Sequence, residues 1–226
     1  LHVAARGFAA GPRAPRALIA SFSIVPASDP PAAADAYIAA RPALAGFLAR
    51  EPWRQELARL IARLGGGLFK RLRNQPPLWT HNDWHPSNLL WSPDGAVQTI
   101  FDFGLATRTC ALHDLAIAIE RTAIPWLQLD EPPDLDAALA ILAGYRSVLP
   151  LGSGDVETVV RLLPLVHVEF ALSEVDYFAG ILADADQATL AWETYLIGHA
   201  EWFLTPPGQG FLQQFERGAL PGEAEA

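Results

Sequence analysis

The sequence is short of three residue types, and each shortage is informative. A single cysteine, Cys110, excludes an internal disulfide and any cysteine-rich zinc site, which favours a reducing, cytoplasmic compartment. The chain begins at Leu1 and has no methionine, so we expect it to be a piece of a longer protein. Lysine occurs once, at Lys70, which limits where a lysine-dependent chemistry could be placed.

Positive charge and long apolar runs are also scarce. Lys and Arg number 16 against 25 Asp and Glu, which gives a formal net charge of −9. Nucleic-acid and anionic-membrane binders draw their affinity from basic residues, so we expect neither partner. No uncharged apolar run reaches the roughly 18 residues that a membrane helix needs. The composition that remains, 51% hydrophobic and 18% charged, predicts a globular chain with a substantial core.

Apolar residues recur at helical spacing through most of the chain. They predict helices over residues 1–6, 32–40, 42–49, 51–64, 113–124, 134–149, 155–182 (kinked at Pro164) and 187–204. The clear β signal lies in "LWT" and in "NLLW" and "VQTIFDF", which flank a Pro-Asp-Gly turn and predict a hairpin. We therefore expect a mainly α fold with a small β-hairpin (α+β) over residues 1–204, followed by a frayed tail over residues 205–226.

Residues 80–88, "THNDWHPSN", gather two histidines, a carboxylate and an amide in nine positions. His81, Asp83 and His85 alternate in a way that suits zinc ligands. A two-metal zinc hydrolase, however, draws further histidines and aspartates from distant loops, and the other histidines of this chain form no second cluster. The sequence therefore favours a different chemistry for this loop.

Phosphoryl transfer accounts for more of the pattern. His81, Asp83 and Asn88 fit the spacing His-x-Asp-x-x-x-x-Asn, and Asp102 opens an Asp-Phe-Gly directly after an apolar strand. In this chemistry an aspartate orients the acceptor hydroxyl, while hard oxygen ligands hold Mg²⁺. Asp83 suits the first task, and Asn88 and Asp102 suit the second. The hairpin should bring positions 88 and 102 together, because they lie at equivalent depths on its two strands.

The run "HNDWHPSNLLW" followed by "IFDFG" resembles the aminoglycoside phosphotransferase/choline kinase family, which has the protein-kinase-like fold. The resemblance is close over roughly residues 75–122. It implies a small-molecule kinase that uses Mg²⁺ and ATP or another nucleoside triphosphate. In such an enzyme Asp83 is the catalytic aspartate, and Asn88 and Asp102 bind the metal.

The resemblance also assigns supporting residues. It implies that His81 packs and hydrogen-bonds within the loop, and that Asp114 braces the loop from the next helix. The alternative for Asp114 is a simple acidic residue in the first turn of a helix. Family members often have glycine where this chain has Asn82, so the backbone at this position is expected to differ slightly.

Two features bear on the kind of kinase. Only Leu105–His113 separate Gly104 from Asp114, and no Ala-Pro-Glu follows, which leaves no room for a peptide platform and favours a small acceptor such as an aminoglycoside, choline, homoserine or a sugar. A glycine-rich phosphate cover is not visible, and Lys70 does not lie on an early strand. We therefore expect the C-terminal lobe without its ATP-binding lobe, inactive alone. A non-catalytic binding or regulatory remnant is the alternative.

Candidates for acceptor binding lie in the catalytic loop and in "HVEFALSEVDYF". The acidic side chains of that helix would suit a cationic acceptor, and a solvated helix face is the alternative. The candidates are Trp84, His85, Glu169, Glu174, Asp176 and Tyr177, with His167 of the same helix and Trp126 as further possibilities. Core packing is the alternative for Trp126, and a loop-bracing hydrogen bond is the alternative for His85.

Overall fold

The computed structural model describes residues 1–11, 13, 18, 21–125 and 131–220. These residues are mostly helical and carry two small antiparallel sheets, which agrees with the predicted α+β fold class. None of the helices in these ranges is long and apolar enough to cross a membrane.

Short helices make up the N-terminal part. They are α1 (His2–Ala5), α2 (Pro30–Ala39), α3 (Pro42–Leu48), α4 (Trp53–Leu64) and α5 (Leu68–Leu72). In α4 the apolar residues recur at helical spacing, so that Trp53, Leu57 and Leu60 are buried along one face. The helix ends at Gly65, whose N–H donates to the Ile61 carbonyl oxygen. The glycine run that follows α4 therefore terminates a helix.

Two strand pairs frame the predicted catalytic loop. Strands β2 (Leu89–Trp91) and β3 (Val97–Ile100) form the predicted hairpin, and β1 (Pro77–Thr80) pairs antiparallel with β4 (Thr107–Cys110). The second pairing was not predicted, because the short polar run "TRTC" carries no alternating apolar pattern. It clamps the chain on both sides of residues 81–106, where all the predicted loop residues lie.

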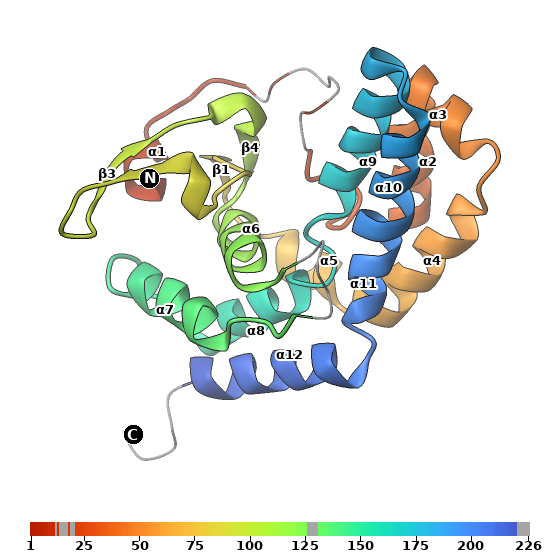
Figure 1. The fold of residues 1–226 in the computed structure, drawn as a ribbon. Coiled ribbons are helices and arrows are strands. Elements are labelled where there is room, and N and C mark those ends of the chain that lie inside the picture. The colour runs from red at the N-terminus through yellow and green to blue at the C-terminus, as the bar shows by residue number, and fades with distance from the viewer. Residues whose placement is uncertain (12, 14–17, 19–20, 126–130, 221–226) are drawn as a thin grey trace.

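Helix α6 (Ala111–Ala123) starts directly after β4 and runs through the middle of the molecule (Figure 1). It packs against α7 (Leu135–Arg146), α8 (Ser153–Leu162) and both strands of the β1–β4 pair. Ten of its 13 residues are buried, and these include His113, Asp114 and Glu120. Buried polar groups need partners, so α6 is the natural place for an internal polar network.

The predicted helix over residues 155–182 is broken rather than kinked. Helix α8 ends at Leu162, residues 163–167 form turns around Pro164, and α9 covers Val168–Tyr177. Proline lacks the N–H that would continue the helical ladder, which explains the break. The remaining elements before the last helix are a π-helix (Phe178–Leu182), α10 (Ala185–Leu190), a second π-helix (Ala191–Gly198) and α11 (His199–Trp202).

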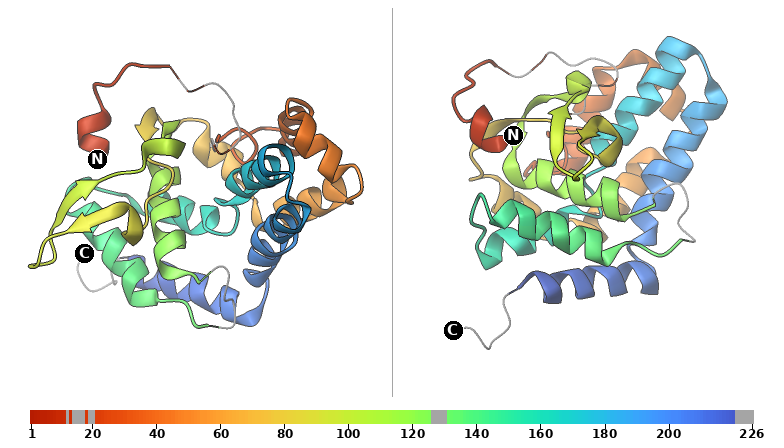
Figure 2. Two further views of the ribbon diagram at one scale, coloured as in Figure 1. Left: turned by 45° about the horizontal axis from the view of Figure 1, so that its top comes forward. Right: turned by 60° about the vertical axis from the view of Figure 1, so that its left-hand side comes forward.

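The prediction of a frayed tail from residue 205 is wrong for most of that segment. Residues Pro206–Ala219 form α12, which lies along α7 and α8 (Figures 1 and 2). The two prolines occupy the first turn, where proline is tolerated, and Thr205 caps the helix by accepting from the Gly208 N–H. Phe211 and Phe215 are buried, which holds the helix down. Residues 221–226 lie outside the described residues.

Candidate active site

Asn82 sets the backbone of the candidate catalytic loop. Its φ is +60°, in the left-handed region where glycine is favoured and asparagine is the common substitute. The Asn82 side chain is hydrogen-bonded to residues of the β1–β4 pair and to the loop before β4. Its Oδ1 accepts from the Thr80 hydroxyl (2.9 Å) and the Thr109 hydroxyl (3.2 Å), and its Nδ2 donates to the Leu105 carbonyl (3.2 Å). These bonds explain how a residue larger than glycine is held there.

Asp114 braces the loop from α6. Its Oδ1 accepts from the Asn82 N–H (2.7 Å), and its Oδ2 accepts from the His81 N–H (3.3 Å) and lies 2.7 Å from His2 Nε2. Burial by itself raises the pKa of Asp114, but the His2 ring and the two amides outweigh burial and hold the pKa below its ordinary value. The residue lies in the first turn of α6, yet its oxygens serve the loop, as the resemblance implies.

His81 has the contacts of a packed, non-reacting residue. The side chain is fully buried, and its Nε2 lies 2.9 Å from the Phe101 carbonyl oxygen. Its ring packs against Trp84 and Phe103. Because His81 faces Phe101, it does not form a metal trio with Asp83 and His85. No group of three or more His, Cys, Asp or Glu suited to a metal exists among the described residues.

Asp83 is held through both carboxylate oxygens. Asn88 Nδ2 donates to the Asp83 carbonyl (2.9 Å) and to Asp83 Oδ2 (3.2 Å). Oδ1 lies 2.6 Å from Arg121 Nη1 and 3.7 Å from His85 Nε2. The carboxylate therefore has one orientation, set by an amide on one side and a guanidinium on the other.

Asn88 and Asp102 meet at the base of the hairpin, as their positions in the sequence predict. The Phe101 N–H donates to the Asn88 carbonyl (3.2 Å), which puts Asp102 one residue beyond the paired position. Asp102 is exposed with φ +57°, and its Oδ1 accepts from the Gly104 N–H (3.2 Å). Within the described part of the chain nothing donates to Asn88 Oδ1 or Asp102 Oδ2. These two hard oxygens suit Mg²⁺ that is shared with phosphates.

Arg121 belongs to this site, and the sequence reasoning missed it. It lies seven residues after Asp114, two turns along the same face of α6, so the face that braces the loop also delivers the guanidinium. That spacing is the signal that could have found it. Its guanidinium stacks on the Phe170 ring, 4.2 Å from the ring centre.

The structure separates the acidic acceptor candidates on α9. Glu174 lies near Asp83 and Arg121: burial and Asp83 raise its pKa to about 7, against the opposing effect of Arg121. Glu169 is not available to an acceptor, because its oxygens already accept from two hydroxyls and two backbone N–H groups of residues 21–24. Asp176 accepts from the Leu44 N–H (3.2 Å) near the start of α3.

The other candidates have mixed surroundings. His85 contacts Ser87 through Nδ1 (2.7 Å), and burial followed by Arg121 lowers its pKa against the effect of Asp83. Tyr177 is half-buried beside Phe178. His167 is buried and its Nε2 lies 3.0 Å from the Leu196 carbonyl, so it packs inside the protein, and the alternative of a solvated helix face is wrong for this residue. Trp126 lies outside the described residues.

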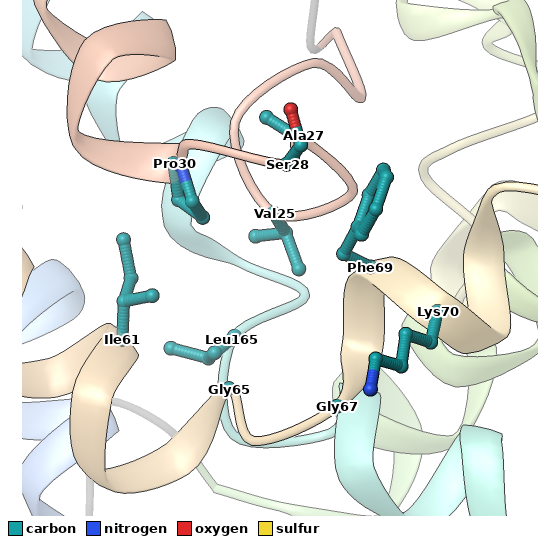
Figure 3. Close-up of a pocket in the computed structure, with 10 residues that line it drawn as sticks. All are labelled: Val25, Ala27, Ser28, Pro30, Ile61, Gly65, Gly67, Phe69, Lys70 and Leu165. Carbon is teal, nitrogen blue, oxygen red and sulfur yellow. The ribbon is translucent and has the colours of Figure 1, made fainter.

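Two further cavities are lined by none of the three residues Asp83, Asn88 and Asp102. One of about 480 Å³ lies between α1, the hairpin, α6 and α7, and Trp84 forms part of its wall. The other, about 270 Å³, lies between residues 25–30 and the ends of α4 and α5 (Figure 3). Its wall is mostly apolar, with Val25, Ile61 and Leu165 facing one another, and Lys70 is at its edge (Figure 3). The surroundings of Lys70 are therefore apolar and do not resemble a phosphate-binding site.

The profile of the phosphotransferase enzyme family matches residues 13–154, more than half of the chain and the whole of the catalytic loop. No curated protein matches the chain.

Proposed function

Because this chain belongs to the phosphotransferase enzyme family, we propose that it carries the transfer site of a small-molecule kinase with a protein-kinase-like C-terminal lobe. The donor is ATP or another nucleoside triphosphate with Mg²⁺, and the acceptor is the hydroxyl of a small molecule. The supporting observation is the convergence on Asp83: Asn88 binds its carboxylate and pairs across the hairpin beside Asp102.

The residues divide the work of the reaction. Asp83 receives the acceptor hydroxyl, aligns its oxygen for attack on the γ-phosphorus and takes the hydroxyl proton. As the new oxygen–phosphorus bond forms, the bond from the γ-phosphorus to the bridging oxygen breaks and the nucleoside diphosphate leaves. Asn88 and Arg121 hold the two carboxylate oxygens, so the reactive orientation exists before the acceptor arrives. Asn88 and Asp102 would hold Mg²⁺, which supplies charge neutralisation for the phosphates when it is bound.

The acceptor class follows from the groups around Asp83. Glu174 is a half-buried carboxylate near Asp83, and no described residue donates a hydrogen bond to it. An acceptor ammonium group would both satisfy and ionise it. An amino alcohol or amino sugar is therefore the preferred acceptor, ahead of a neutral sugar.

Substitution of the catalytic aspartate tests the proposal. In the full product of the gene that encodes this chain, we expect Mg²⁺-dependent transfer of ³²P from γ-labelled ATP to one of a panel of aminoglycosides, choline, homoserine and sugars. Asp83→Asn should lower kcat by about 10²–10⁴-fold, because it removes the base and its charge.

Asp94→Asn is the matched control. Asp94 is exposed in the hairpin turn of the same loop region, so kcat should stay near the wild-type value. Retention of wild-type kcat by Asp83→Asn would contradict the mechanism. Absence of transfer to every acceptor would favour a non-catalytic binding or regulatory role for the fold.

A further inference from the structure

We propose that Arg121 is a positioning residue for the transfer reaction, and that the C-terminal helices beyond the family match hold it in place. This inference rests on the proposed function. It assigns a reaction role to residues between 167 and 199, which lie after the matched range of 13–154.

The first step is the contact with the catalytic carboxylate. Arg121 Nη1 lies 2.6 Å from Asp83 Oδ1, and the two side chains are only 11% and 14% exposed. In such a water-poor place an ion pair is much stronger than at the surface, and removal of one partner leaves an uncompensated charge. Arg121 therefore fixes the direction in which Asp83 points.

The second step is what fixes Arg121. Phe170 of α9 lies under the guanidinium at 4.2 Å. Its charged or polar neighbours include the Tyr195 hydroxyl and the Glu120 and Glu174 carboxylates. These groups come from α6, α9 and the π-helix Ala191–Gly198, so three elements enclose one guanidinium.

The third step concerns the residues that hold the neighbours of Arg121 in place. Glu120 Oε1 lies 2.8 Å from His199 Nε2, and both side chains are at most 1% exposed. His167 packs edge-on against the His199 ring and contacts the Leu196 carbonyl within the π-helix. π-helical turns alter the carbonyl and side-chain directions of a helix and are frequent at functional sites. Here the π-helix carries Tyr195, a neighbour of Arg121.

The space beside the cluster is nearly closed. The cavity bordered by Arg121, Tyr195, Phe170 and Asn82 has a volume of only about 10 Å³, close to the room for one water molecule. The low exposure of the Arg121 and Asp83 side chains likewise keeps most bulk water away from their ion pair. The C-terminal helices hold the charge that orients the catalytic carboxylate, so they contribute to the reaction as well as to the core.

Kinetics of Arg121 variants test the proposal. Arg121→Met keeps the length of the side chain and removes its charge, and we expect kcat to fall about 100-fold while the KM for nucleotide changes less than threefold. Arg121→Lys keeps the positive charge but lacks the planar guanidinium with its paired N–H donors. Its kcat should therefore be about tenfold higher than that of Arg121→Met. Arg59→Met is the matched control: Arg59 makes a surface ion pair with Glu201, and its kcat should equal that of the wild type.

A double-mutant cycle measures the pair directly. In urea unfolding, Arg121→Met should raise the unfolding equilibrium constant, and the factor of this rise should be at least tenfold smaller in an Asp83→Asn background than in the wild type. Such coupling supports the pairing, and additive effects contradict it. Should Arg121→Met fail to fold, Arg121→Lys decides by its kcat, which must lie at least threefold below that of the wild type.

Failure of the positioning role of Arg121 can be distinguished from failure of the proposed kinase function. A wild-type enzyme that transfers phosphate while Arg121→Met retains kcat within threefold overturns this inference and leaves the proposed function intact. A wild-type enzyme that transfers phosphate to no acceptor overturns the proposed function itself, and with it the positioning role.

Discussion

At the residue scale, neighbouring side chains of the site carry charges of opposite sign. Asp83 faces Arg121, and Arg121 faces Glu174 and Glu120. Glu174 is the partner whose ionisation changes near neutral pH, because burial followed by the Asp83 charge raises its pKa to about 7. Its charge state therefore sets the electrostatic environment of Asp83 in the physiological range.

Glu174→Gln should change the pH dependence of stability. The folded protein holds the Glu174 proton more tightly than the unfolded chain, whose pKa is 4.5, so the stabilisation is complete below pH 4.5 and is lost as the pH rises through about 7. The glutamine variant lacks this loss. We expect its unfolding free energy to rise relative to wild type between pH 5 and pH 8, by about 1–3 kcal/mol.

Urea denaturation at several pH values measures the difference. Glu193→Gln, the same substitution at an exposed position of the π-helix, reports what the loss of a surface carboxylate does. A constant difference between Glu174→Gln and wild type over the whole pH range would contradict the placement of Glu174.

At the element scale, one buried carboxylate joins the N-terminal segment to α9. Glu169 accepts from the backbone N–H groups of Ser23 and Ile24 and from the hydroxyls of Ser21 and Ser23. The Tyr37 hydroxyl of α2 donates to the Glu169 carbonyl (3.3 Å). The acidic side chain that the sequence suggested for an acceptor is in fact a structural tether.

Glu169→Gln should release that tether. The amide carries one acceptor and an NH₂ group that opposes the donors of residues 21–24, so we expect a loss of about 2–3 kcal/mol in unfolding free energy. Hydrogen exchange of the Ser23 and Ile24 amides should accelerate more than tenfold. Unchanged exchange at these two amides, with Glu193→Gln as the reference variant, would rule out the tether.

At the scale of the whole molecule, α12 closes the helical layer formed by α7 and α8. Phe215 is fully buried and Phe211 nearly so, although they follow a stretch rich in proline and glycine. The right-hand view of Figure 2 shows α12 running beneath α7. The helix is therefore part of the core.

Phe215→Ala tests this. We expect a loss of about 3–5 kcal/mol in unfolding free energy, because the substitution removes buried aromatic contacts and leaves a cavity. Gln213→Ala, two residues away on the exposed face, should stay within about 0.5 kcal/mol of wild type. Equal urea midpoints for the two variants would show that α12 contributes nothing to the core.

Much of the site was predictable from local sequence. The spacing of Asp83, Asn88 and Asp102 follows from loop, strand, turn and strand in succession, and the hairpin register brings the last two together. The conformation of Asn82 is also locally determined, since the left-handed position before Asp83 needs glycine or its nearest substitute. Short-range geometry of this kind is encoded within about twenty residues.

The remaining features depend on contacts between distant parts of the chain. Arg121 pairs with Asp83, Glu169 binds residues 21–24, and Phe215 packs under α7 and α8, and none of these partners is adjacent in sequence. Charge and periodicity alone leave open whether a helical carboxylate faces solvent, substrate or backbone. The sequence by itself determined the local geometry of the candidate catalytic loop, because hydrogen bonds between near neighbours in the chain fix it. Only tertiary packing decided which side chains surround that loop, because burial forces each polar group to find a partner that chain order does not name.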